Sequence, residues 1–294
     1  MSGKTKIAAG LVDAKGRLEG TAMASTHLGN DGGDIFNQCY ELVEKLVAKN
    51  RASIIGLGIC TVGMVDPVKG IIRKSSVPAL NGAHIQRLFE DRFKVPVCVE
   101  NDLNAPGYGE YLYGAGEGSK LFVYMTLSTG AGISIIYNGK IWRGAHNVAG
   151  FVGPVRGLRD GSSLESMFSG RGIAARAGDA FRRKVDTEEV FRLASKGSKP
   201  ATRIIGDAVY HAALVVASIQ VMIDPDMIVI GGSLGVNQPG FIGKIKVLAE
   251  KMLGPMMVML PDGVNISVSQ LGSYNGVIGA VALLRDRPNG KVRP

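Results

Sequence analysis

The sequence predicts an α/β fold with parallel strand pairing, and three observations support this prediction. Short runs of β-branched and other apolar residues alternate with segments whose apolar residues recur at helical spacing. The strand-like runs show little alternation with polar residues, as is typical of strands that are buried on both faces of a sheet. The chain of 294 residues is also long for a single hydrophobic core, so two lobes are expected.

The first lobe is predicted to comprise residues 1–114. Its strands, recognised by their β-branched content and by the turn residues between them, are expected at 6–11, 18–26, 53–59 and 95–99. Its helices, recognised by apolar residues three and four positions apart, are expected at 34–49, 84–93 and 105–113.

The second lobe is predicted to comprise residues 115–273. It begins with a strand at 120–127 and a hairpin at 132–143, whose Asn138-Gly139 pair is a strong turn signal. Three helices and two further strands should follow, at 164–180, 187–196, 201–223, 227–230 and 265–269. The terminal segment 274–294 begins with a helix-like run to 284 and is expected to pack back on the first lobe.

Bulk composition excludes several functional classes. The net charge is +9, but lysine and arginine are scattered and lack interleaved aromatic residues, so nucleic acid is not an expected partner. No apolar signal segment is present, and the longest apolar run, 212–223, is too short to span a membrane. Cys39, Cys60 and Cys98 lie far apart and form no metal-ligand spacing, which indicates reduced thiols in a cytoplasmic protein.

An internal similarity suggests that the two lobes arose by duplication around a cleft. Residues 9–18 and 133–141 both follow the order strand, tight turn, basic residue, strand, and each follows a loop containing Thr and Gly. The second loop follows a clear strand, whereas only Met1 and Ser2 precede the first loop. If the halves are homologous, we expect the first to lack a leading strand. Chance similarity between two hairpins is the alternative explanation.

The most informative stretch is 97–102, where a buried strand runs into Glu100-Asn101-Asp102. Ligands of open α/β sheets bind outside the carboxyl ends of the strands, so Asp102 is a candidate general base. The alternative is structural, since Asp and Asn are favoured residues at the N-terminus of a helix such as the one predicted at 105–113.

Two glycine-bearing loops follow predicted strands, at 128–132 and 231–235. Glycine allows backbone N–H groups to approach a phosphate closely, and Thr129 adds a hydroxyl donor. Neither loop has the Walker A pattern, and a single glycine turn is usually only a turn. Two such loops together with a strand-end acid favour phosphoryl transfer, which requires phosphate positioning, a divalent metal ion and a base.

The order of these motifs resembles the ROK family, which comprises bacterial sugar kinases and sugar-responsive repressors. The resemblance covers nearly the whole chain and rests on residues 4–13, 100–105, 127–132, 138–145, 164–173 and 230–232. It implies a two-lobed, duplicated ribonuclease H-like fold, as in the actin-like ATPases, with a central cleft. It also implies dimers, which are common in the family.

The resemblance assigns roles to individual residues of a sugar kinase. Asp102 would deprotonate a hexose or N-acylhexosamine hydroxyl, and Asn101 and Glu165 would hold sugar hydroxyls. For Glu165 the alternative is an acid that only stabilises the first turn of a helix. ATP with Mg²⁺ would be bound by Thr5, Thr129, Gly130, Gly132, Gly231 and Gly232.

Several positions depart from the family pattern. Met1 stands in place of an acid on the metal side, and Phe151 and Pro154 stand in place of a sugar-binding Glu and a sugar- or zinc-binding His. The segment 155–163 has no cysteine, so no structural zinc is expected. These changes predict altered or weak sugar binding. A catalytically silent sugar- or nucleotide-binding protein is therefore the second hypothesis, and a transcriptional regulator is a more distant third.

Overall fold

The computed structural model describes residues 6–26, 33–156 and 160–286. The chain forms two compact units. The first comprises Met1–Gly114 and Leu271–Pro294, and the second comprises Ala115–Gln270. Parallel pairing of β3 with β6, and of β10 with β7 and β11, confirms the predicted α/β class.

The first unit contains six strands and four α-helices within its described residues. The strands are β1 (Lys6–Val12), β2 (Leu18–Ser25), β3 (Leu57–Thr61), β4 (Met64–Asp66), β5 (Ile71–Lys74) and β6 (Val97–Asn101). The helices are α1 (Gly33–Asn50), α2 (Ile85–Phe93), α3 (Asn104–Tyr113) and α10 (Asn275–Ala282), with short 3₁₀ turns η1 (Pro78–Leu80), η3 (Gly272–Tyr274) and η4 (Leu283–Asp286).

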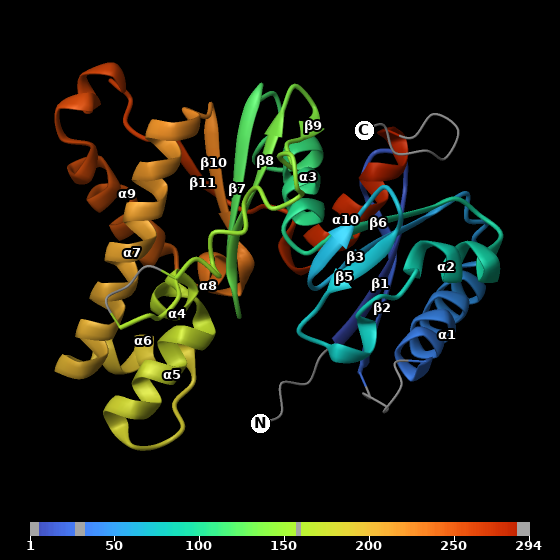
Figure 1. Ribbon diagram of the computed structural model, residues 1–294, viewed down its shortest axis with the longest axis horizontal. Helices are drawn as coiled ribbons and strands as arrows, with labels where there is room; N and C mark the ends of the chain where they lie inside the picture. The colour runs from blue at the N-terminus through green and yellow to red at the C-terminus, as the bar shows by residue number, and fades with distance from the viewer. Residues whose placement is uncertain (1–5, 27–32, 157–159, 287–294) are drawn as a thin grey trace. The chain divides into compact units, whose positions relative to one another are not determined.

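Helices cover the strands of the first unit on two sides (Figure 1). Helix α1 packs on β1 and β2, and α2 packs on β5 and β6, while α10 packs on β1, β3 and β6. Helices α3 and α10 cross very closely, because glycines lie at the contact: a Cβ on Gly279 would lie 1.7 Å from the carbonyl oxygen of Ala105. This crossing fixes α3, which begins two residues after Asp102.

The strands of the first unit pair only in twos. The antiparallel pair β1–β2, the parallel pair β3–β6 and the antiparallel pair β4–β5 form separate sheets, and none of the described strands joins β1 to β3. In the second unit a strand occupies the corresponding central place, since β7 pairs with both β8 and β10. The two-strand pairs leave β1 and β3 only partly buried.

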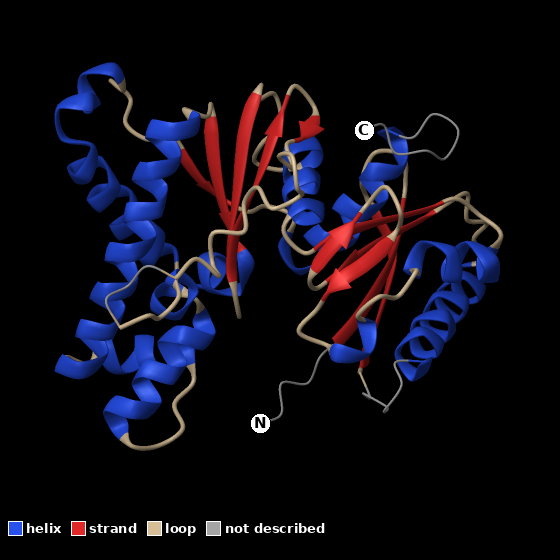
Figure 2. Cartoon of the chain, in the orientation of Figure 1, coloured by secondary structure: helices blue, strands red, loops and turns tan. Residues whose placement is uncertain are grey.

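The second unit is built on a sheet with the strand order β11-β10-β7-β8-β9 (Figure 2). These strands are β7 (Leu121–Leu127), β8 (Ala131–Tyr137), β9 (Lys140–Ile141), β10 (Met227–Gly231) and β11 (Ile266–Val268). The helices are α4 (Leu164–Phe168), α5 (Gly170–Phe181), α6 (Thr187–Ser195), α7 (Lys199–Ile223), α8 (Gly232–Asn237) and α9 (Pro239–Leu253), followed by the 3₁₀ segment η2 (Gly254–Met259).

Helix α7 is the central helix of this unit, where it contacts α4, α5, α6 and α9. It is long and apolar enough, by length and composition, to cross a membrane, but 56% of that apolar window is buried inside the protein. Its buried side chains belong to the same core as β7, β8 and β10. Helix α7 therefore serves as a core helix of this unit.

The structure differs from the local predictions in several places. The predicted helix 164–180 is two helices, because Ser169 has extended backbone and its hydroxyl accepts the Gly172 N–H at the start of α5. The glycine segment after β10 is not a simple turn, since Gly232 opens helix α8. Helix α9 and the β4–β5 hairpin were not predicted.

Candidate functional site

Asp102 lies at the carboxyl edge of the β3–β6 pair. Strand β6 is fully buried up to Asn101, and the next residue, Asp102, is exposed. Because β3 runs parallel to β6, with Thr61 opposite Asn101, both strands end at this edge. The structure thus delivers a solvent-accessible carboxylate to the edge at which α/β sheets bind ligands.

The neighbour of Asp102, Asn101, makes the hydrogen bonds that a helix cap makes. The Asn101 side-chain oxygen accepts from the backbone N–H groups of Leu103 and Asn104, at 3.0 and 2.7 Å. The residue at the N-cap position of α3 is Leu103, and no side chain caps it from there. Asn101 therefore organises the first turn of α3.

Glu100 is a buried residue of this cluster that sequence reasoning did not single out. It is 1% exposed, and its Oε1 accepts from the Asn101 N–H at 2.9 Å and from the Asn104 side-chain amide at 3.2 Å. The sequence did contain an indication of this role, namely an acid inside an otherwise apolar strand. Acids are rarely buried unless they have hydrogen-bond or ionic partners. Glu100 fixes the backbone that presents Asp102.

Cys60 lies beside this cluster and is not a candidate nucleophile. Burial raises the pKa of its thiol, and the nearby Asp102 and Glu100 carboxylates raise the pKa further. A thiol with a raised pKa stays protonated at neutral pH, whereas the thiolate is the nucleophilic form. Burial likewise raises the pKa of Cys39 to about 11.

In the second unit, the loop 128–130 joins β7 to β8. Thr129 at its tip is exposed, and the Ser128 N–H donates to the Gly130 carbonyl at 2.9 Å. Within the part of the chain that the structure describes, the N–H groups of Thr129 and Gly130 have no protein acceptor. Gly132 pairs with Thr126 and therefore belongs to strand β8, not to the loop 128–130.

The structure brings the second glycine segment next to this loop. The Ser128 and Ser233 hydroxyl oxygens are 3.4 Å apart. Gly232 has φ +80°, and a Cβ there would lie 2.4 Å from the Leu127 carbonyl oxygen, so only glycine fits. Parallel pairing of β7 and β10 explains the meeting, because both strands end at the same edge.

Glu165 also lies against this loop. Its Oε2 accepts from the Ala131 N–H at 3.3 Å, and a Cβ on Gly130 would lie 3.0 Å from that same oxygen. The Glu165 N–H donates to the Gly153 carbonyl at 3.0 Å. Glu165 does occupy the first turn of α4, but it additionally holds together the loop and the segment 150–153. Thr5 lies outside the described residues.

The segment that includes Phe151 and Pro154 presents mainly apolar groups. Phe151 is half-buried and Pro154 is exposed, while Val148 and Val155 are 56% and 51% exposed. The Gly150 carbonyl accepts from Ile133 N–H at 2.9 Å, which anchors the segment to β8. The segment therefore contacts Glu165 through Gly153 and otherwise offers mainly apolar side chains.

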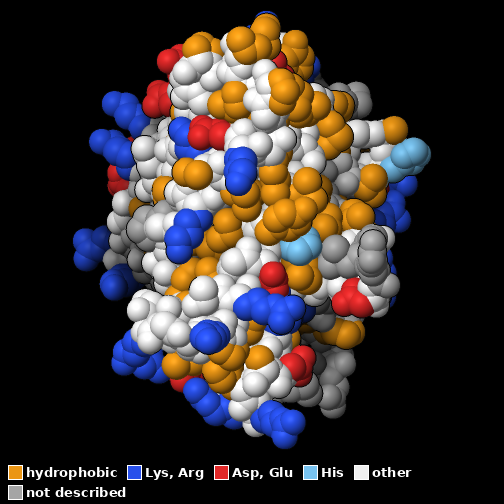
Figure 3. Space-filling model, turned by 90° about the vertical axis from the view of Figure 1, so that its left-hand side faces the viewer, with side chains coloured by type: hydrophobic (Ala, Val, Ile, Leu, Met, Phe, Trp, Pro, Cys, Tyr) orange, Lys and Arg blue, Asp and Glu red, His pale blue; other side chains and the backbone are white. Residues whose placement is uncertain are grey.

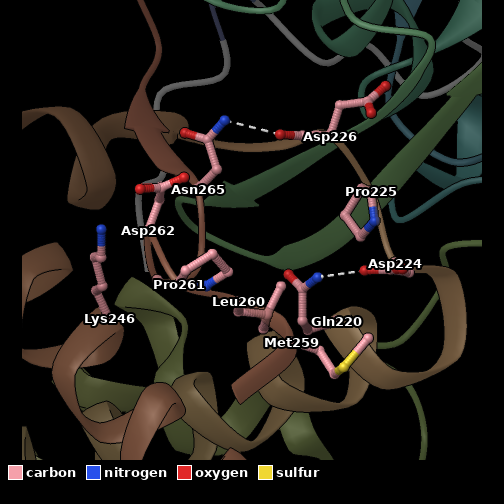
Figure 4. Close-up of a pocket in the computed structure, with 11 residues that line it drawn as sticks. Gln220, Asp224, Pro225, Asp226, Lys246, Met259, Leu260, Pro261, Asp262 and Asn265 are labelled. Atoms are coloured by element: carbon pink, nitrogen blue, oxygen red, sulfur yellow. Dashed lines mark hydrogen bonds between the residues drawn. The ribbon is translucent and has the colours of Figure 1, made fainter. Parts of the chain in front are cut away.

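A pocket of about 440 Å³ lies at the opposite edge of the same sheet (Figure 4). It sits where β7, β10 and β11 begin, and two of its polar residues, Asp226 and Asn265, hold these strands together. The Asp226 carboxylate accepts from the N–H groups of Lys120 and Leu121, both at 2.7 Å, and the Asn265 amide donates to the Asp226 carbonyl at 2.8 Å. These contacts have a structural purpose, and ligands of α/β sheets bind at the other edge.

No group of three or more His, Cys, Asp or Glu side chains that could hold a metal ion occurs among the described residues. The arrangement supplies an exposed carboxylate in one unit, and in the other a glycine-bearing loop with accessible N–H groups.

The chain is similar to known proteins of one family. A family model described as "ROK family" matches residues 2–287. The bifunctional enzyme NanE/NanK of Brucella melitensis is 38% identical over 64% of the chain, and the match spans only 35% of that relative's length. The N-acetylmannosamine kinase of Salmonella arizonae is 26% identical over 96% of the chain and 95% of the relative.

Two solved structures share the fold over nearly their whole length. The ROK hexokinase of Thermus thermophilus has a TM-score of 0.82 and 28% identity, with 97% of this chain and 98% of that chain covered. The glucokinase of Streptomyces griseus, solved with glucose and AMPPNP, has a TM-score of 0.79 and 25% identity over the same shares, 97% and 98%.

Proposed function

Because the chain belongs to the ROK family and has the fold of the actin-like ATPases, we propose that it is an ATP-dependent sugar kinase. The reaction would transfer the γ-phosphate of ATP to a hydroxyl of a hexose or an N-acylhexosamine, in the cytoplasm. The observation that carries this proposal is Asp102, an exposed carboxylate at the carboxyl end of the parallel β3–β6 pair.

In this proposal Asp102 accepts the proton of the sugar hydroxyl as that oxygen attacks the γ-phosphate. Phosphoryl transfer needs little covalent help from the protein, so positioning and charge stabilisation supply most of the rate. Asp102 is suited to the role because Asn101 and Glu100 fix its backbone while leaving it exposed.

The nucleotide phosphates would be bound by the loop 128–130 and by Gly231 and Gly232. The accessible N–H groups of Thr129 and Gly130 fit an anion. Glycine at positions 231 and 232 lets this segment pack against Tyr124 and the Leu127 carbonyl, next to the loop 128–130. Mg²⁺, when bound, would neutralise phosphate charge, and it would be held chiefly by the phosphates themselves.

Asn101 and Glu165 would contact the sugar through side-chain atoms that are not used in their hydrogen bonds within the protein. The Asn101 side-chain oxygen already accepts two backbone N–H groups, so its amide nitrogen is the group that would donate to a sugar oxygen. Glu165 uses Oε2 on the Ala131 N–H and would accept from a hydroxyl with Oε1.

A screen of hexoses and N-acylhexosamines for ATP turnover tests the proposed function. At least one sugar should give turnover that depends on both the sugar and Mg²⁺. Thermal-shift measurements on the same sugars separate the alternative, since ligand binding stabilises the folded state whether or not catalysis follows. Sugar-dependent stabilisation without any turnover would instead identify a silent binding protein.

We expect the double substitution Phe151→Glu with Pro154→His to strengthen sugar binding. Each unpaired sugar hydroxyl costs about 1–3 kcal/mol, so restoring two polar partners should lower KM at least ~10-fold with a smaller effect on kcat. Initial-rate kinetics with the best sugar of the screen measure this. Val148→Glu is the matched control, since Val148 is also exposed in this segment and should leave KM unchanged.

A further inference from the structure

The first unit has an open position in its strand order. In the second unit, β7 lies between the parallel pair β10–β11 and the antiparallel pair β8–β9, and it pairs with β10 and with β8. The first unit has the same two kinds of pair, the parallel β3–β6 and the antiparallel β1–β2, but no described strand joins them. The strand that would correspond to β7 is therefore missing from the described part of this unit.

Helix α10 holds the two strands that flank the open position. A Cβ on Gly58 of β3 would overlap the backbone of Ala280, and a Cβ on Gly10 of β1 would lie 3.0 Å from the Val277 Cγ1 atom. Val277 and Ala280 are neighbours one turn apart on α10. Strands β1 and β3 therefore cross the same helix within one turn, in one layer, and yet they do not pair with each other.

Strand β3 directs backbone groups toward the open position. The Leu57 N–H donates to the Pro96 carbonyl at 2.9 Å, on the β6 side of the strand. Because successive residues of a strand point their backbone groups to opposite sides, the N–H and carbonyl groups of Gly58 and Cys60 point away from β6. None of the described strands lies there to pair with them. A strand edge of this kind is a template for the addition of another strand.

The flanking strands are also less buried than their counterparts in the second unit. Strands β7, β8 and β10 are buried along most of their length, whereas every residue of β3 is only half-buried and Ala8 of β1 is exposed. An added strand would remove apolar surface of β1 and β3 from water, which favours association.

We propose that the open position between β1 and β3 is a binding site for one extended segment of a separate polypeptide. The segment pairs antiparallel to β1 and parallel to β3, as β7 pairs with β8 and with β10. In this mode of recognition, main-chain hydrogen bonds give the affinity and alternate side chains give the specificity.

The two faces of the open position define the side chains of the bound segment. On one face Gly10 and Gly58 pack directly on α10, so a residue between them has to be glycine or alanine. On the other face Leu57 and Ile59 pack against a core cluster that includes Ile35 of α1, where apolar β-branched residues fit. The expected partner segment therefore matches the five residues of β3 in length and alternates small with β-branched residues.

A different exposed apolar surface, formed by α7 and η2, does not suit an extended segment. Figure 3 shows hydrophobic side chains gathered along the middle of the face that these elements present. Met222 of α7 is 75% exposed, and Val258 and Met259 of η2 are 81% and 79% exposed. A helix uses its backbone N–H and carbonyl groups internally, so this surface offers no row of groups with which a strand can pair. It therefore provides a control for adhesion that depends on apolar contact alone.

A synthetic peptide added to the full chain tests the site without relying on catalysis. The probe is Val-Ala-Val-Gly-Val with two lysines at each end, and the control peptide has proline in place of the central valine, which removes a ladder hydrogen bond. At about 100 μM the probe should raise the melting temperature by about 2–4 °C and slow hydrogen exchange of the Gly58 and Cys60 amides, measured by NMR, about 10-fold or more. The Leu57 and Ile59 amides face β6 and should not change.

A fused form of the probe removes the dependence on affinity. Joined ahead of Met1 by a glycine-serine linker, the same segment has a high effective concentration and should protect the same two amides in every molecule. Met222→Asp, on the surface of α7, is the matched control variant and should leave both effects unchanged.

Three results would overturn the proposal. The first is a fused chain in which the Gly58 and Cys60 amides exchange as fast as in the unfused chain. The second is equal protection by the probe and by the proline peptide. The third is protection that appears without any peptide and grows with chain concentration, since a second copy of the chain would then be the occupant.

Discussion

Replacing Asp102 by Asn is expected to lower kcat about 10²- to 10⁴-fold, because a general base contributes a factor of this size to proton transfer. The amide has nearly the shape of the carboxylate but cannot accept the hydroxyl proton. KM for the sugar should change little, since the substitution removes an interaction that develops in the transition state. Initial-rate kinetics with the sugar found by the screen measure both constants.

The structure predicts that this loss is not accompanied by misfolding. Asp102 is exposed, and the hydrogen bonds of the first turn of α3 come from Asn101, so the melting temperature of the variant should match that of the wild type. Asp91→Asn, which changes an exposed acid of α2, is the matched control and should keep full activity. Full kcat in Asp102→Asn would show that another group takes the proton.

Local patterns account for the parts of the fold that the sequence predicted well. The Asn138-Gly139 turn was foreseen because both residues readily adopt positive φ, and they do so here at +50° and +76°. The strand at β6 was predictable for a similar reason, since its buried apolar residues stop at Glu100-Asn101-Asp102. These signals act over a few neighbouring residues and depend little on distant contacts.

The details that the sequence did not disclose depend on contacts between distant residues. The sequence left open which residue caps α3, because Asn101 and Asp102 are both favourable capping residues. The path of the backbone decides which side chain reaches the N–H groups of the first turn. The contact of Glu165 with the Ala131 N–H joins residues 34 positions apart. The missed helix α9 is a different case, since its residues 241–253 do show helical periodicity.

Replacing Gly279 by Ala is expected to destabilise the first unit by about 3 kcal/mol or more, toward the upper end of typical overpacking costs. The new Cβ would lie 1.7 Å from the Ala105 carbonyl oxygen and 2.5 Å from its carbonyl carbon. Both atoms belong to the backbone of α3, so no side chain can move aside to relieve the clash. Gly109 keeps the same crossing close from the other helix, since a Cβ there would lie 3.0 Å from the Asn275 carbonyl oxygen.

Urea unfolding of Gly279→Ala should be compared with that of Gly243→Ala. The difference between the two unfolding midpoints separates the clash at the α3–α10 crossing from the intrinsic effect of alanine on helix stability. Both glycines lie within helices, and alanine should stabilise each helix by about 0.5–1 kcal/mol where nothing obstructs it. A Cβ on Gly243 would meet no atom within 4 Å, so Gly243→Ala should be neutral or stabilising. Because α3 begins two residues after Asp102, any Gly279→Ala protein that still folds should also lose activity, whereas Gly243→Ala should retain it. Equal unfolding midpoints for the two variants would mean that α3 and α10 can separate freely, and the crossing would then not be what holds Asp102 in place.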